Sequence, residues 1–453
     1  MRYAKDESVR REMYSAFSKQ CPDNTELLQK AIGLRAKAAQ LLGYKSHAEY
    51  VISDKMAKTS DNVTEFISSL RDKLCPLAKH EIAEREELKK ADKETSGEEY
   101  RGLFKWDTGY YTTIIKERKH DINMEEVKKY FSSKSVVSGI LDIYQNMLSL
   151  RFAKVENPPV WHPDVEMYEV REAASDDFLG HFYLDLFPRE NKYNHAAMWP
   201  IRTAHTNLDG SLEYPVAAMV ANFPKATSST PALMQHGDVV TFMHEMGHVF
   251  HSLCSRTKWS RFHGPSVEGD FVEAPSQMLE NWAWEPSVLQ KFAVHYKTGE
   301  AIPEDLIKRL VASKNEGSGI FYLRQLLYGS YDMELHNTST GDVDVKKIFS
   351  DLSENITMLT EDDENTWDYT TFGHVMSEYS AGYYGYLWSQ VFSADMYNTR
   401  FLRDGVDNPQ TGLDYRREIL LPGSSRDGSI SLRAFLGREP QNDAFLKSIG
   451  LSE

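Results

Sequence analysis

Two histidines one helical turn apart, His244 and His248, constrain this chain more than any other feature of its sequence. They lie in the stretch T-F-M-H-E-M-G-H-V-F-H, residues 241–251. On an α-helix, side chains four residues apart project from one face, so both imidazoles can share a metal ion. Glu245 lies beside them, where a carboxylate can take a proton from a metal-activated water. The stretch is therefore predicted to be a helix, with Asp238 as its N-cap.

The third ligand separates the alternatives for this motif. The pattern can arise by chance, and a lone histidine on an apolar helix is more often a core residue than a ligand. A metzincin would carry a glycine and a histidine where this chain has His251 and Cys254, so that class is rejected. A following helix can instead supply a carboxylate, and the segment G-D-F-V-E-A-P-S-Q offers Glu273. Two histidines and a glutamate leave a fourth position open, as in catalytic zinc sites.

The composition is that of a soluble globular protein. Of 453 residues, 41% are hydrophobic and 26% are charged, and the net charge is −15. This acidity argues against nucleic acid or a membrane surface as a partner, and no segment approaches the ~20 apolar residues of a membrane helix. The N-terminus has no apolar core for a secretion signal. The cysteines are odd in number and lack a CxxC pair, which favours a reducing compartment: Cys21, Cys75 and Cys254. We therefore expect a cytoplasmic protein, and we expect it to be a monomer.

The first part of the chain, residues 1–155, has the texture of a helical region. Apolar residues recur at helical spacing in residues 26–34 and again in residues 62–74. Residues 79–92 are so rich in charged residues and good helix formers that we expect a long, solvent-exposed helix. The sequence therefore predicts a helical region over residues 1–155.

The second part, residues 156–453, is predicted to carry the metal site. Three short segments rich in β-branched and aromatic residues predict a small sheet directly before the histidine helix: residues 165–171, 178–187 and 216–223. The last of these segments is either an edge strand that pairs with a peptide backbone or an ordinary buried strand. From Asp238 onward the chain is helical almost to its end. The lobes built from the two parts can interleave.

Residues 373–386, G-H-V-M-S-E-Y-S-A-G-Y-Y-G-Y, form a second group of interest, with four tyrosines and a histidine among glycines. One interpretation is a flexible loop that leads into an aromatic core helix. The other is chemical, because a phenol stays protonated at neutral pH and can donate a hydrogen bond to a developing oxyanion. From composition alone both interpretations stay open.

Four separate segments together resemble a known family. The first segment is H-E-M-G-H at residues 244–248, and the second is F-V-E-A-P-S-Q-M-L-E-N-W at residues 271–282. The third, F-Y-L-D-L-F-P-R at residues 182–189, precedes them, and the fourth, F-L-G-R-E-P at residues 435–440, lies near the C-terminus. These motifs resemble the family of zinc oligopeptidases that includes thimet oligopeptidase, neurolysin and saccharolysin. The resemblance runs from Y-A-K-D at residues 3–6 to the end of the chain.

The resemblance implies a mainly α, two-lobed, zincin-type fold with a deep channel and one small sheet near the zinc helix. Residues 1–155 would form part of the channel wall. It implies a metalloendopeptidase that hydrolyses short, unstructured peptides. One zinc ion per chain would be held by His244, His248 and Glu273. Glu245 would be the general base that takes a proton from the zinc-activated water and returns it to the leaving amine.

The same resemblance assigns roles in the glycine–tyrosine stretch. Tyr386 is implied as the donor to the oxyanion, with Tyr383 and His374 as further catalytic contacts and Tyr379 as a substrate-binding residue. Glycines there would give the stretch the freedom to close on substrate.

The sequence departs from the family in one respect and leaves two other functions open. Family members usually carry a long helical N-terminal region before the point where this chain begins. A dipeptidyl carboxypeptidase on the same scaffold is one alternative, and it would anchor the free carboxylate of a peptide. An inactive, truncated peptide-binding protein is the other, although an intact Glu245 argues against it.

Overall fold

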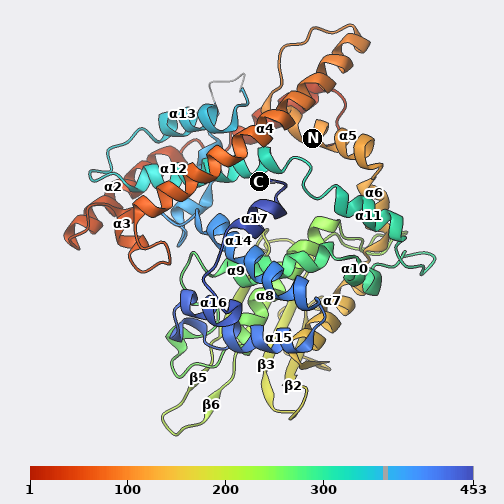
Figure 1. The fold of residues 1–453 in the computed structure, drawn as a ribbon, viewed down its shortest axis with the longest axis vertical. Helices are drawn as coiled ribbons and strands as arrows, with labels where there is room; N and C mark the ends of the chain where they lie inside the picture. Colours follow the sequence, from red (N-terminus) through yellow and green to blue (C-terminus); the bar gives the residue numbers. More distant parts are fainter. Residues whose placement is uncertain (361–365, 452–453) are drawn as a thin grey trace. The chain divides into compact units, whose positions relative to one another are not determined.

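The computed structural model describes residues 1–360 and 366–451, which form two compact units (Figure 1). The first unit contains Met1–Asp121, Ser313–Leu387 and the chain from Leu446 onward; the second contains Ile122–Ala312 and Trp388–Phe445. The units therefore interleave along the chain and are not the consecutive regions 1–155 and 156–453. The difference arises because residues 313–387 pack with the N-terminal helices.

The first unit is built from helices, and its centre is the pair α4 and α12, which lie side by side (Figure 1). Gly319 lets the two helices approach closely, because a Cβ added there would lie 2.8 Å from the backbone nitrogen of Ala78. Two helices, α14 and α17, continue from one unit into the other. The helices with residues in this unit are α1 (Glu7–Ser18), α2 (Asn24–Leu41), α3 (His47–Ile52), α4 (Ser60–Ser96), α5 (Thr108–His120), α12 (Ser318–His336), α13 (Val345–Thr357), α14 (Gly385–Met396) and α17 (Asp443–Ser448).

Helix α4 corrects one expectation about exposure. Residues 79–92 belong to this 37-residue helix, yet Glu81, Arg85 and Lys89 are buried. Lys89 Nζ lies 2.7 Å from the carboxylate of Asp107, and Glu81 accepts hydrogen bonds from backbone N–H groups at the start of α12. Buried charges are tolerated when they are paired in this way. Charge content alone could not distinguish this inner polar stripe from a solvated face.

The second unit contains a five-stranded mixed sheet with the order β1-β2-β3-β7-β4. Strands β3 and β7 are parallel, and the other neighbours are antiparallel. The strands are β1 (Leu150–Lys154), β2 (Glu166–Glu172), β3 (Phe178–Asp185), β4 (Ala197–Arg202) and β7 (Val216–Val220), and a separate hairpin joins β5 (His205–Thr206) to β6 (Leu212–Glu213). All three predicted strand segments are confirmed.

Of the two interpretations of residues 216–223, the ordinary buried strand is confirmed and the edge strand is wrong. Strand β7, which begins at Val216, lies inside the sheet between β3 and β4, so the strand at that end is β4. The sequence concealed β4 because Pro200 interrupts it, and Pro is tolerated in a sheet mainly on edge strands.

Helix α8 packs against the sheet through contacts with β3, β4 and β7. Its apolar side is fully buried, with Phe250 stacked on Phe152 at 5.1 Å between ring centroids. The helices of the second unit that precede α14 are α6 (Met124–Val127), α7 (Ser133–Leu148), α8 (His236–Cys254), α9 (Glu273–Leu279), α10 (Pro286–Phe292) and α11 (Glu304–Ala312), and those that follow are α15 (Pro409–Tyr415) and α16 (Gly428–Leu436). The predicted class, mainly α with one small sheet near the histidine helix, is confirmed.

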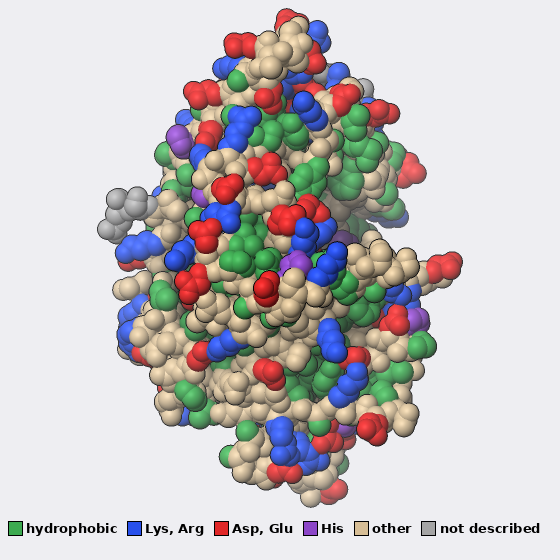
Figure 2. Space-filling view, turned by 90° about the vertical axis from the view of Figure 1, so that its right-hand side faces the viewer, with side chains coloured by type: hydrophobic (Ala, Val, Ile, Leu, Met, Phe, Trp, Pro, Cys, Tyr) green, Lys and Arg blue, Asp and Glu red, His purple; other side chains and the backbone are tan. Residues whose placement is uncertain are grey.

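On the face drawn in Figure 2, acidic and basic side chains are interspersed, and neither sign forms a continuous patch there. Among the residues that the structure describes, no helix combines the length and the apolar character needed to cross a membrane.

Candidate metal centre

The N-cap of helix α8 lies three residues before the predicted one. Gln235 is the N-cap, with extended backbone, and Asp238 occupies the third helical position. The Asp238 carboxylate accepts a hydrogen bond from the backbone N–H of Gln235 at 2.8 Å. The N-cap prediction is therefore wrong by three residues, but an acid in the first turn still stabilises the helix start.

Helices α8 and α9 touch where the metal motif lies. A Cβ added to Gly247 would lie 2.8 Å from the Cα of Ser276, so only glycine fits there without a shift. This close approach brings the start of α9, where Glu273 is the first helical residue, against the histidine face of α8.

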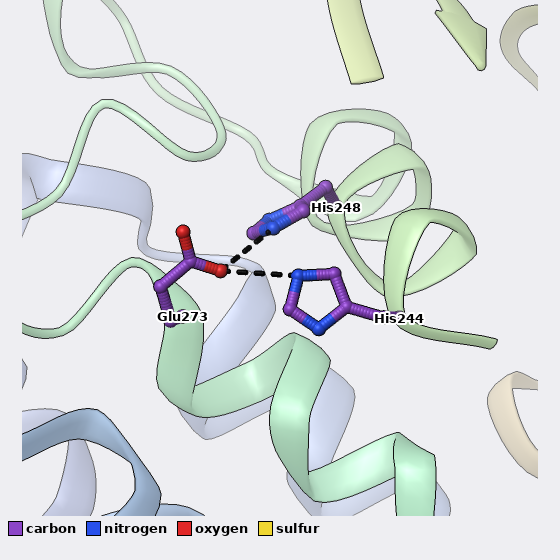
Figure 3. Close-up of side chains that lie close together, drawn as sticks. All are labelled: His244, His248 and Glu273. Carbon is purple, nitrogen blue, oxygen red and sulfur yellow. Dashed lines mark hydrogen bonds and ion pairs between the residues drawn. The ribbon is translucent and has the colours of Figure 1, made fainter. Parts of the chain in front are cut away.

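Three side chains from these two helices converge on one point (Figure 3). His244 Nε2 and His248 Nε2 each lie 3.1 Å from Glu273 Oε2. One ligand atom from each residue lies within 4.8 Å of the other two. The structure thus brings together the three residues that the sequence singled out as ligands.

Sequence reasoning missed a fourth residue of this centre, Glu280. Its Oε1 accepts a hydrogen bond from Nδ1 of His244 at 2.7 Å, which leaves Nε2 of that ring facing Glu273. A carboxylate on the outer nitrogen of a ligating histidine fixes its tautomer and orientation. Glu280 follows Glu273 by two helical turns, and that spacing in E-A-P-S-Q-M-L-E was the signal available in the sequence.

The carboxylates of the centre have different electrostatic surroundings. Burial would raise the pKa of Glu273, but the nearby His248 and His244 outweigh it and hold that pKa well below its usual range. Burial would lower the pKa of His244, yet its bonds to Glu273 and Glu280 raise it. Burial dominates at Glu245 and raises its pKa. Glu273 is therefore held charged, while Glu245 becomes a better proton acceptor.

The aromatic residues of the glycine–tyrosine stretch cluster in the first unit. The His374 ring lies 5.6, 5.0 and 5.7 Å from the rings of Tyr379, Tyr383 and Tyr386, and Tyr379 stacks on Tyr386 at 5.3 Å. Tyr386 Oη lies 3.4 Å from His374 Nε2. The fourth tyrosine, Tyr384, is buried in the core. The four residues named from the sequence thus form one group, and it belongs to a different unit from the metal-ligand cluster.

The comparison with protein families decides the classification. The model of Peptidase family M3 matches residues 1–451. The chain belongs to Peptidase family M3. This result confirms the resemblance inferred from the four sequence motifs.

Curated relatives in family M3 match this chain along its whole length. Saccharolysin of Saccharomyces cerevisiae is 39% identical over 461 residues, which cover 100% of this chain and 65% of the relative. Thimet-like oligopeptidase of Dictyostelium discoideum is 38% identical, with 100% and 68% covered. Oligopeptidase A of Escherichia coli is 34% identical, with 100% and 67% covered. The chain spans about two thirds of the length of these family M3 relatives.

Solved structures confirm the fold of this family M3 chain. An M32 carboxypeptidase from Deinococcus radiodurans superposes with a TM-score of 0.57 at 13% identity, covering 97% of this chain and 77% of that one. A Pyrococcus furiosus carboxypeptidase gives a TM-score of 0.55 at 13% identity, covering 98% and 78%. At this identity the likeness concerns the fold alone.

Proposed function

We propose that this member of family M3 is a zinc metalloendopeptidase that hydrolyses short, unstructured peptides. The observation that carries the proposal is the convergence of His244, His248 and Glu273, with ligand atoms within 4.8 Å of one another. Its curated relatives include proteins named oligopeptidases, which supports peptides as the substrate class. We carry over from the sequence the expectation of a monomeric, cytoplasmic enzyme.

The donor set fits zinc. Zinc in catalytic sites takes imidazole nitrogens and a carboxylate oxygen, with one position left open. Here Nε2 of His244 and Nε2 of His248 face one oxygen of Glu273 at equal distances of 3.1 Å, as expected of ligands that surround a common cation. Glu280 supplies the outer hydrogen bond that orients His244. We propose one zinc ion per chain, which would act as a Lewis acid on the peptide carbonyl and on water.

Glu245 is the proposed general base. Its side chain is 8% exposed and feels the charges of His244 and His248, so it lies beside the ligand cluster. Burial raises its pKa, which brings the carboxylate closer to the pH at which a base works best. The carboxylate would take a proton from water and deliver it to the amine that leaves when the peptide bond breaks.

The tyrosine group is the proposed source of oxyanion stabilisation. Burial raises the pKa of Tyr383, so its phenol stays protonated and can donate. We assign the donor to Tyr386 because the stretch matches the family's motif at this position; its Oη lies 3.4 Å from His374 Nε2, whereas Tyr383 Oη donates to Gln325 at 2.8 Å. Tyr383 and His374 would be further contacts to the reacting carbonyl, and Tyr379 would bind substrate.

Strand β4 is the proposed docking edge for the peptide backbone. It is one of the two end strands of the five-stranded sheet, and it contacts α8. A backbone hydrogen bond from Met198 in this strand helps to lower the pKa of Glu245, so the strand reaches the proposed base. A peptide that pairs with β4 would be recognised through its main chain, which predicts broad side-chain tolerance.

The function is tested by measuring zinc content together with cleavage of an internally quenched fluorescent peptide. Wild type should contain one zinc per chain and cleave the peptide, and a chelator should abolish the cleavage. Amidating the C-terminus of the peptide separates the alternatives. An endopeptidase cleaves the amidated peptide, whereas a dipeptidyl carboxypeptidase needs the free carboxylate. Stoichiometric zinc without cleavage of either form would favour a binding protein.

A further inference from the structure

A single buried carboxylate outside the metal centre organises the glycine–tyrosine stretch. Asp332 lies in α12 and is 1% exposed. Its Oδ1 accepts a hydrogen bond from the backbone N–H of Ala381, and its Oδ2 accepts from Gly382 and Tyr383, each at 2.9 Å. Three consecutive backbone amides of the stretch are therefore bound by one side chain from another helix.

The carboxylate is also held by a histidine of its own helix. Nδ1 of His336, one turn further along α12, lies 2.9 Å from Asp332 Oδ1. With the proton on Nδ1, the Nε2 atom of His336 accepts from Arg35 at 3.1 Å, and Arg35 also donates to the carbonyl of Val375. A carboxylate has about four acceptor sites, and here four donors occupy them. The geometry leaves Asp332 little freedom to rotate.

The bound amides lie where the stretch adopts an unusual backbone. Ala381 has a φ of 54°, in the left-handed region that residues other than glycine seldom occupy. Such conformations persist only where the surroundings enforce them, and they cluster at functional sites. The hydrogen bond from the Ala381 N–H to Asp332 Oδ1 holds Ala381 in this conformation.

We infer that Asp332 is a positioning residue that sets the orientation of Tyr383 and Tyr386 for the hydrolysis proposed above. Tyr383 carries one of the three bound amides, and Tyr386 follows it by one helical turn at the start of α14. The hydrogen bonds of Asp332 go to the backbone that carries the two tyrosines, and through this backbone Asp332 would set where their side chains lie. This inference rests on the proposed function.

The test compares Asp332→Asn with Glu334→Gln, an exposed acid on the same helix that serves as the control for loss of charge. The asparagine turns an N–H group toward backbone donors, so at least one pair of contacts is lost. We expect kcat for a quenched peptide to fall about 10²-fold, the effect of a small misplacement of a catalytic group, with KM within a few-fold of wild type. Glu334→Gln should match wild type. His336→Gln leaves the three backbone hydrogen bonds intact, so its kcat should lie between those of Asp332→Asn and wild type. It replaces Asp332→Asn in the test if that variant does not fold.

Hydrogen–deuterium exchange on the same proteins provides a readout that does not depend on activity. Amides in residues 377–386 should exchange faster in Asp332→Asn, while those of α4 keep wild-type protection. Unchanged exchange in that stretch overturns the inference whether or not the chain cleaves peptides. Faster exchange with unchanged kcat overturns the catalytic part. Wild type that binds zinc but cleaves no peptide contradicts the proposed function instead, and the exchange result still decides whether Asp332 holds the stretch.

Discussion

The metal-ligand cluster and the glycine–tyrosine stretch are both groups of converging side chains, yet they are held in different ways. His244, His248 and Glu273 come from two regular helices in direct contact, and the spacing of residues along each helix sets their directions. The residues from His374 to Tyr386 lie largely outside regular helix, and one carboxylate about fifty residues earlier in the chain binds their backbone. A site on regular elements can be inferred from local spacing, whereas a site on irregular backbone depends on a distant partner.

The largest effect should come from removing a ligand. His248→Ala takes one imidazole from the cluster, and two ligands are too few for a stable zinc site. We expect zinc content to fall from one per chain to near zero, and cleavage to be lost with it. Metal analysis after dialysis checks this, with His251→Ala as the control because His251 is buried on the same helix but is not in the cluster. Near-equal zinc in wild type and His248→Ala would refute the ligand assignment.

Glu245→Gln should separate metal binding from chemistry. The amide cannot accept a proton from water, so turnover should fall by roughly 10²–10⁴-fold while zinc content stays at one per chain. Rates on a short peptide and metal content on the same sample make the comparison. Retention of more than about a tenth of wild-type activity would assign the base to another residue.

Tyr386→Phe tests whether the irregular region contributes to catalysis. Removing the hydroxyl keeps the ring, and loss of one oxyanion donor typically costs roughly 10²–10³ in kcat with little change in KM. Tyr384→Phe is the matched control, since Tyr384 lies in the same stretch but is buried in the core. The control should alter the thermal melt more than kcat. If Tyr386→Phe lowers the melting temperature and leaves kcat unchanged, the stretch is structural and the oxyanion role passes to Tyr383.

Glu280 gives the smallest expected effect and tests how far the metal centre extends. Glu280→Ala removes the acceptor for His244 Nδ1, and loss of such an outer partner typically weakens metal affinity about 10–100-fold. Glu280→Gln keeps an acceptor oxygen and should lose less. Competition with a zinc chelator measures both variants. Equal affinity in wild type and Glu280→Ala would limit the centre to its three ligands.

The sequence predicted those parts of the molecule that depend on local periodicity. Histidines four residues apart and an acid on the next helix indicated the metal cluster, and alternating β-branched segments indicated three strands of the sheet. Strand β4 was missed because Pro200 obscures its pattern. The role of Asp332 could not be predicted, because no pattern near residues 381–383 indicates a hydrogen-bond partner in another helix. The burial of charged residues of α4 was not predicted for the same reason, since their partners, such as Asp107, lie on other elements.

X-ray absorption at the zinc edge is the sharpest test of the proposed zinc ligands, because it reports the atoms around the metal in the purified protein. We expect two imidazole nitrogens at roughly 2.0–2.1 Å from the zinc, and oxygen ligands from Glu273 and water at roughly 2.0–2.2 Å. We also expect almost no zinc signal from dialysed His248→Ala samples, because two ligands are too few for a stable site. A sulfur shell at about 2.3 Å, or a zinc surrounded by oxygen alone, would refute this set of ligands.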